Sequence, residues 1–182
     1  MPIRRSPALS SRSPLAPFLP APVALPPSTL APPTLKELQT EVRELLRAAA
    51  VFPLPAVVRR LQHRVLSRVD DALDGADHPR LYVLEIAGAV PRVKIGVSTN
   101  PRSRVRQHVT EMTRYQHGLV DAYVTAPLGD PLAADRAEGQ AHRWMRKIFA
   151  PIGTEEFAYG DFDFGVVCAD QAVRIQGEAG AW

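Results

Sequence analysis

Two pairs of side chains in the second half of the sequence are of types suited to chemistry on a phosphate group. Arg104 and His108 are four residues apart, which places both on one face of a helix. Glu138 and His142 repeat that interval. A guanidinium binds two phosphate oxygens at once, a carboxylate is a common magnesium ligand, and an imidazole relays protons. The spacing alone also fits solvated helix faces, so the elements that carry these residues decide what they mean.

The charge pattern supports a nucleic-acid partner only locally. The formal net charge is +3, but residues 1–33 hold three arginines and no acid, so the remainder is formally neutral. The stretch 92–114 carries six basic residues against one acid, Glu111. The single cysteine, Cys168, excludes an internal disulfide framework and a Cys-rich zinc site. No apolar run approaches the ~18–20 residues of a membrane-spanning helix, and a cytoplasmic location is expected.

Two segments precede the region that carries these residues. Residues 1–33 contain ten of the eighteen prolines and no periodic pattern, which predicts a disordered tail. Residues 34–77 predict a helical hairpin: Thr34 and Glu37 have the capping-box spacing, and Pro53 and Pro55 separate the two helices. The hairpin is expected to pack on itself, on the main domain or on a second copy, so a homodimer through residues 34–73 is one expectation.

Residues 78–176 predict the main domain, followed by a short tail at 177–182. Two β-rich runs, 81–86 and 92–97, flank a Gly-containing turn and predict a hairpin. Asn100-Pro101 and Asp130-Pro131 are helix starts, and 119–125 is a third strand between the two helices. A loop and a last helix, from Asp161 to about Ile175, complete the domain. The fold class is therefore α/β (α+β), with a small, mainly three-stranded antiparallel sheet flanked by helices.

This ordered set resembles the GIY-YIG nuclease superfamily over roughly half the chain. Leu81-Tyr82-Val83 lies where that family has its first tripeptide, and Lys94-Ile95-Gly96 where it has its second. An arginine in the next helix and a glutamate in the helix after the third strand follow in the family's order. Glu155-Glu156-Phe157 is similar to a late acid-aromatic element of a phage and bacterial DNA-binding branch.

The resemblance implies a metal-dependent DNA endonuclease with five catalytic positions. Glu138 would hold Mg²⁺ or another divalent cation, Arg104 would grip the scissile phosphate, and Tyr82 would take a proton from water. Lys94 replaces the family's second tyrosine and would orient or neutralise the phosphate. His108 would relay a proton or contact phosphate. Basic side chains expected on the DNA backbone are Arg92, Arg102, Arg106, Arg114 and Arg143.

The departure at Lys94 leaves two other functions open. One is a GIY-YIG-like protein that binds DNA without cutting it. The other is a helical interaction or scaffold protein that associates through residues 34–73. His142 is expected to support the site rather than act in catalysis. Glu155 is expected either as a second acid in the cleft or as a group that fastens the last loop.

Overall fold

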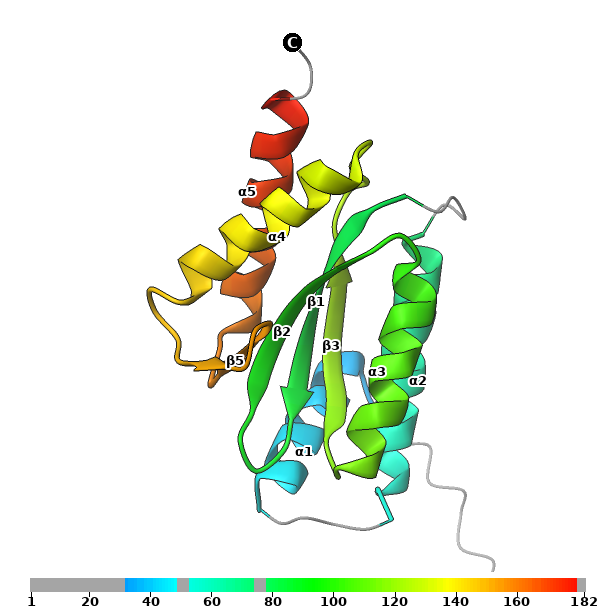
Figure 1. The fold of residues 1–182 in the computed structure, drawn as a ribbon. Helices are drawn as coiled ribbons and strands as arrows, with labels where there is room; N and C mark the ends of the chain where they lie inside the picture. The colour runs from blue at the N-terminus through cyan, green and yellow to red at the C-terminus, as the bar shows by residue number, and fades with distance from the viewer. Residues whose placement is uncertain (1–31, 49–52, 74–77, 180–182) are drawn as a thin grey trace, which may run out of the picture. The chain divides into compact units, whose positions relative to one another are not determined.

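The computed structural model describes residues 32–48, 53–73 and 78–179. Its elements, in chain order, are α1 (Leu35–Ala48), α2 (Ala56–Asp71), β1 (Arg80–Ala87), β2 (Arg92–Ser98), α3 (Pro101–Arg114), β3 (Gly118–Val124), α4 (Pro131–Met145), β4 (Pro151–Ile152), β5 (Glu156–Ala158) and α5 (Phe162–Ala179) (Figure 1). The expected disordered tail falls almost entirely outside these ranges. Within them, no helix combines the length and the apolar character required to cross a membrane.

The sheet is antiparallel and has five strands in the order β3-β1-β2-β5-β4. The three long strands are the three expected from the sequence, but the expectation of a mainly three-stranded sheet is wrong. β4 and β5 add a small hairpin, turned at Gly153 with φ +71°, to the β2 edge. Strands of two and three residues are too short to produce a periodic pattern, so the sequence indicated only a loop there.

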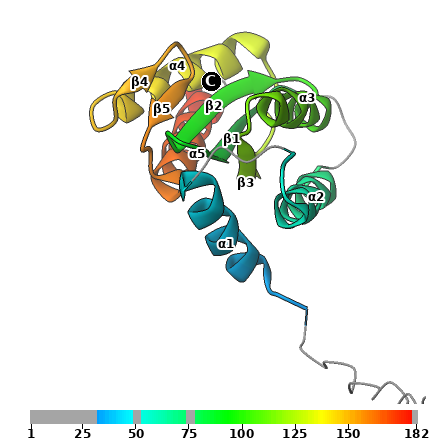
Figure 2. The same ribbon diagram turned by 90° about the horizontal axis from the view of Figure 1, so that it is seen from below.

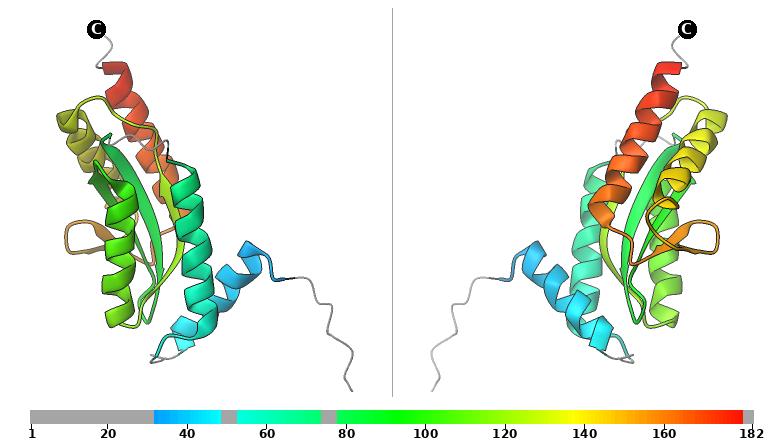
Figure 3. Two further views of the ribbon diagram at one scale, coloured as in Figure 1. Left: turned by 90° about the vertical axis from the view of Figure 1, so that its right-hand side faces the viewer. Right: turned by 90° about the vertical axis from the view of Figure 1, so that its left-hand side faces the viewer.

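Helices cover both faces of the sheet, and β1 alternates between two cores. Tyr82, Leu84 and Ile86 face the first core, which α1, α2 and α3 complete. Leu81 and Val83 face the second core, which α4 and α5 complete. In Figure 1, α4 and α5 lie to the left of the sheet, and α2 and α3 to its right; Figures 2 and 3 show the same separation from other directions.

The pair α1 and α2 packs on the sheet. The capping box forms: Thr34 N donates to Glu37 Oε2 (2.7 Å), and Glu37 N donates to Thr34 Oγ1 (3.2 Å). The apolar stripe that α1 and α2 present is buried in the first core. A polar link adds to it, because Gln39 Nε2 donates to Asp121 Oδ2 of β3 (2.8 Å). Of the three packing partners expected for the hairpin, the main domain is the one that its apolar stripe contacts.

The helices that carry the expected site residues begin at their predicted caps. Asn100 Oδ1 accepts from Ser103 N (2.9 Å) at the start of α3. The Asp130 carboxylate accepts from Leu132 N and Ala133 N at the start of α4. Because each cap is followed by a proline at the first helical position, both helices have a fixed start, which sets the rotation of the side chains that follow.

Candidate active site at the open edge of β2

Tyr82 lies in the first core, directly across the hairpin from Gly96. The two residues are partners in the β1–β2 register, and only 1% of Tyr82 is exposed. A Cβ placed on Gly96 would lie 2.3 Å from the Tyr82 hydroxyl oxygen and 2.5 Å from Cζ. The glycine of the Lys-Ile-Gly motif therefore provides the space in which the tyrosine ring lies.

Helix α3 brings Arg104 and His108 to the Tyr82 hydroxyl. Tyr82 Oη lies 2.9 Å from His108 Nε2. Arg104, whose Nη1 donates to Gln107 Oε1 at 2.9 Å, is close enough to lower the pKa of the Tyr82 hydroxyl. Burial raises the pKa of Tyr82 to about 12; the Glu155 and Glu138 charges act in the same direction, and Arg104 opposes them. Tyr82 is therefore a neutral phenol at pH 7.

His108 accepts the hydrogen bond that the Tyr82 hydroxyl donates. Burial, followed by the positive charges of Lys94 and Arg104, lowers the pKa of His108, so the imidazole is neutral at pH 7. A neutral imidazole has one unprotonated nitrogen. With Nε2 unprotonated, the Tyr82 hydroxyl donates to it, and Nδ1 carries the hydrogen on the side of Glu111, 3.5 Å away.

Lys94 is largely buried and forms an ion pair. Only 8% of Lys94 is exposed, and its Nζ donates to Glu155 Oε2 at 2.6 Å, with Glu156 Oε1 at 3.9 Å. Burial alone would raise the pKa of Glu155, but the hydrogen bond and charge of Lys94 lower it below its usual value. This ion pair fastens the segment before β5 to β2, as one of the two expectations for Glu155 had it; its role as a second acid in the cleft stays a prediction.

Glu138 and His142 reach the same edge from α4. The paired register of β2 and β5 ends at Lys94, and Ile95 N still donates to Glu155 O (3.0 Å). His142 Nε2 lies 3.0 Å from Ile95 O, and the Glu138 carboxylate accepts from the Val97 amide. His142 is thus a supporting residue that covers a strand edge.

The environment of Glu138 fits a bound cation. Burial raises the pKa of Glu138 to about 6, with further contributions from the charges of Glu155 and Asp135. No basic side chain forms an ion pair with Glu138 in the described ranges. A positive ion at this carboxylate would offset both effects. The described residues form no cluster of three or more acidic, histidine or cysteine ligands, but magnesium is often held by one or two carboxylates and water.

The expected DNA-contacting arginines differ in their partners within the chain. Arg92 pairs with Glu156 (2.9 Å) and approaches His117 Nδ1 (3.0 Å), so it belongs to the interior of the site. Arg102 and Arg106 both pair with Asp70 and tie α3 to α2. Arg102, Arg106 and Arg114 of α3 and Arg143 of α4 are all exposed.

Two residues beside the site were not singled out from the sequence. Glu156, opposite Lys94 in the β2–β5 register, pairs with Arg92; His117 approaches Arg92 from the segment before β3. With Lys94 and His108, they line a pocket of about 190 Å³. The Glu155-Glu156-Phe157 motif was the only signal for Glu156, and no pattern indicated His117.

Searches among protein-family models, curated proteins and solved structures find no match to this chain. The geometry of the site is therefore the basis for a functional assignment.

Proposed function

We propose that this protein is a metal-dependent DNA endonuclease of the GIY-YIG type, which hydrolyses phosphodiester bonds. The observation that carries the proposal is the placement of two side chains of α3 beside one tyrosine hydroxyl: Tyr82 Oη lies 2.9 Å from His108 Nε2, and Arg104 is close enough to lower the Tyr82 pKa. The carboxylates of Glu138 and Glu155 are close enough to raise the Tyr82 pKa.

Each of these groups has a role in hydrolysis. Arg104 would bind the non-bridging oxygens of the scissile phosphate, where its charge offsets the charge that develops in the transition state. A water oxygen would attack phosphorus as its proton passes to Tyr82 Oη, while the Tyr82 proton passes to His108 Nε2. The P–O bond to the leaving strand breaks, and that oxygen takes a proton from solvent.

Glu138 would hold the divalent cation. Bound there, the cation would supply Lewis-acid stabilisation of the phosphate and lower the pKa of a coordinated water. In this scheme Lys94 does not take the proton-accepting role of the missing second tyrosine, because its Nζ is paired with Glu155 at 2.6 Å. Its charge instead favours the neutral form of His108, which the proton transfer requires.

Cleavage of labelled duplex, branched and single-stranded DNA in Mg²⁺ or Mn²⁺ tests the proposal. Arg104→Ala and Glu138→Ala are each expected to lower the cleavage rate at least ~10²-fold, as loss of a transition-state contact does. Arg60→Ala, at an exposed position of α2, is the matched control and should cut at the wild-type rate. Full activity in either variant would refute the assignment of that residue to the active site. No cleavage of any substrate would refute the proposed endonuclease activity.

One observation favours a second candidate, a DNA-binding protein without cleavage activity. The ion pair between Lys94 and Glu155 occupies the place of the second tyrosine and neutralises one carboxylate of the site. Salt-dependent binding of DNA without hydrolysis in either metal would support this candidate.

A further inference from the structure

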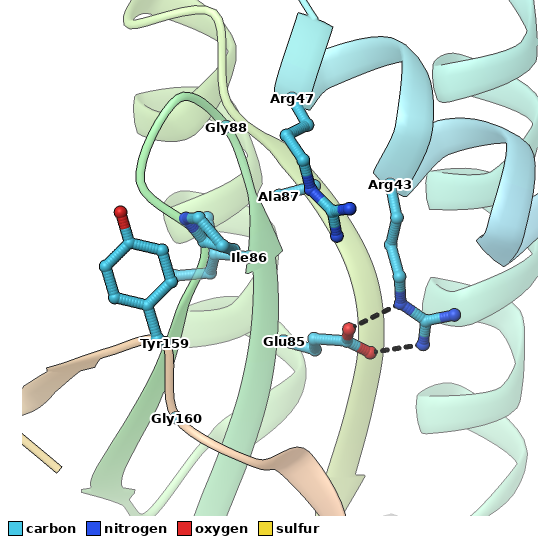
Figure 4. Close-up of a pocket in the computed structure, with 9 residues that line it drawn as sticks. Arg43, Arg47, Glu85, Ile86, Ala87, Gly88, Tyr159 and Gly160 are labelled. Carbon is cyan, nitrogen blue, oxygen red and sulfur yellow. Dashed lines mark hydrogen bonds and ion pairs between the residues drawn. The ribbon is translucent and has the colours of Figure 1, made fainter.

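A second polar pocket lies at the other end of β1 from Tyr82. It has a volume of about 210 Å³ and lies between α1, the β1–β2 turn and the segment that follows β5 (Figure 4). Ala87, in its wall, is ~17 Å along the strand from Tyr82, at about 3.3 Å per residue. The proposed active site uses none of the residues that line it.

Two arginines of α1 enter this pocket from one helix face. Arg43 forms a bidentate pair with Glu85, with Nε–Oε1 at 2.6 Å and Nη2–Oε2 at 2.8 Å. Glu85 first, and Asp163 at longer range, raise the pKa of Arg43. Arg47, one turn later, forms no ion pair with any residue in the described ranges. Arg43 and Glu85 neutralise each other. The Arg47 guanidinium is therefore the positive group of this pocket that can pair with an anionic ligand.

Tyr159 forms the opposite wall in a strained conformation. Its φ is +51°, a region that a residue with a side chain rarely adopts, and the residue is 68% exposed. The backbone is held there by the hydrogen bond from Tyr159 N to Pro91 O (2.8 Å). Figure 4 shows the phenol ring and the Arg47 guanidinium on two sides of the pocket, with Ile86 between them. An exposed aromatic ring kept at a strained position points to a contact with a ligand.

The volume limits what can enter. Pockets that enclose a whole ligand typically measure ~300–1,000 Å³, so about 210 Å³ holds only one end of a ligand. A phosphate fits the Arg47 guanidinium, which offers paired N–H donors. The remainder of the ligand would lie against Tyr159 at the mouth of the pocket, where a flat aromatic group makes the best contact.

We infer that this pocket binds a nucleotide, with the phosphate at Arg47 and the base stacked on Tyr159. The nucleotide is either free or an unpaired nucleotide within a DNA strand, since both carry the same two recognition groups. The inference does not depend on the proposed nuclease activity.

Binding to the full-length protein in EDTA tests the inference, because no hydrolysis occurs under those conditions. The probes are thymidine 5′-monophosphate, thymidine and inorganic phosphate by calorimetry, and a labelled single-stranded oligothymidylate by fluorescence anisotropy. Arg47→Ala and Tyr159→Ala are expected to weaken binding of the monophosphate or the oligonucleotide by about tenfold each, while Tyr159→Phe retains it. Arg60→Ala is the control for loss of one surface charge, and Glu138→Ala should bind as the wild type does.

The outcomes separate the two sources and the alternatives. Tighter binding of the oligonucleotide than of the monophosphate would identify a DNA strand as the ligand, and equal or weaker binding a free nucleotide. Inorganic phosphate bound as tightly as the monophosphate, with no effect of Tyr159→Ala, would overturn the assignment. So would binding that Arg47→Ala leaves unchanged, or no binding of any probe at low salt.

Discussion

Lys94 Nζ and Glu155 Oε2 lie 2.6 Å apart in an ion pair that joins β2 to the segment before β5. The lysine is the more deeply buried partner: its side chain is 10% exposed against 35% for the carboxylate. The pair connects residues 61 positions apart at the point where the sheet stops pairing with β5. It therefore holds the acidic segment against the proposed site.

A double-mutant cycle of Lys94→Met and Glu155→Gln should show strong coupling. Glu155→Gln leaves a buried lysine with only the distant Glu156, at 3.9 Å, so it should destabilise the protein more than Lys94→Met does. The coupling free energy should be about 1–3 kcal/mol in chemical unfolding at pH 7. Since the Glu155 pKa is lowered on folding, this stabilisation should be present above the unfolded pKa and disappear as the pH falls.

An exposed pair provides the control for that cycle. Arg136 and Asp130 are 3.8 Å apart, with side chains 60% and 54% exposed. Arg136→Met with Asp130→Asn keeps a capping side chain and should couple by less than about 0.5 kcal/mol. Coupling at Lys94–Glu155 no larger than this would contradict the role given to the buried pair.

Glu138→Gln should stabilise the protein in a defined pH range. The folded pKa of Glu138 is about 6, raised from 4.5, so its contribution to stability is complete below pH 4.5 and is lost as the pH rises through 6. The amide can still accept from Val97 N. The variant should equal the wild type near pH 4 and exceed it by about 1 kcal/mol at pH 8, a figure reduced for partial solvent exposure.

The same carboxylate should bind the cation. Mn²⁺ or Mg²⁺ should raise the melting temperature of the wild type at pH 8 and leave that of Glu138→Gln unchanged. Two results would contradict the assignment of Glu138 as the metal ligand. One is a Glu138→Gln variant that is less stable than the wild type at pH 8; the other is a variant that the metal stabilises as much as it stabilises the wild type.

Gly96→Ala should displace the Tyr82 ring. The new Cβ would lie 2.3 Å from the hydroxyl oxygen, so either the ring or the strand must move. The expected loss is about 1–3 kcal/mol of unfolding free energy, together with loss of cleavage as the hydroxyl leaves His108. In a Tyr82→Ala background the same substitution should have little effect on stability.

Gly177→Ala is the matched control for the glycine substitution. A Cβ at Gly177 meets nothing within 4 Å, and the residue lies in α5, where alanine is the better helix former. This variant should be neutral or gain up to ~1 kcal/mol. Equal stability of Gly96→Ala and the wild type would show that the ring has room to move.

Local patterns predicted the elements that carry the site. Helix caps at Asn100 and Asp130, and the two β-rich runs around the 88–91 turn, fixed where α3, α4 and the β1–β2 hairpin begin. The spacing of Arg104 and His108 predicted that they share one helix face; both lie in α3, and His108 Nε2 is 2.9 Å from Tyr82 Oη.

Long-range partners were not predictable. Asp70 forms ion pairs with Arg102 and Arg106, and Glu155 forms one with Lys94. The apolar stripe of α2 does not specify which polar side chains meet Asp70, and β5 is too short to leave a periodic pattern in the sequence. The short hairpin of β4 and β5 was missed for the same reason.

Tyr159→Gly should make the protein more stable while weakening nucleotide binding. Glycine adopts a φ of +51° without strain, and the exposed ring contributes little packing, so a gain of about 1 kcal/mol over the wild type or over Tyr159→Ala is expected. Gln116→Gly is the matched control, because Gln116 has a φ of +60° and does not line the pocket. It should gain similar stability and leave monophosphate and oligonucleotide binding unchanged. A gain in both variants, with binding lost only in Tyr159→Gly, would assign the strain at Tyr159 to the ligand. Equal binding in the two variants would show that the strained φ of Tyr159 serves the turn alone and not the ligand.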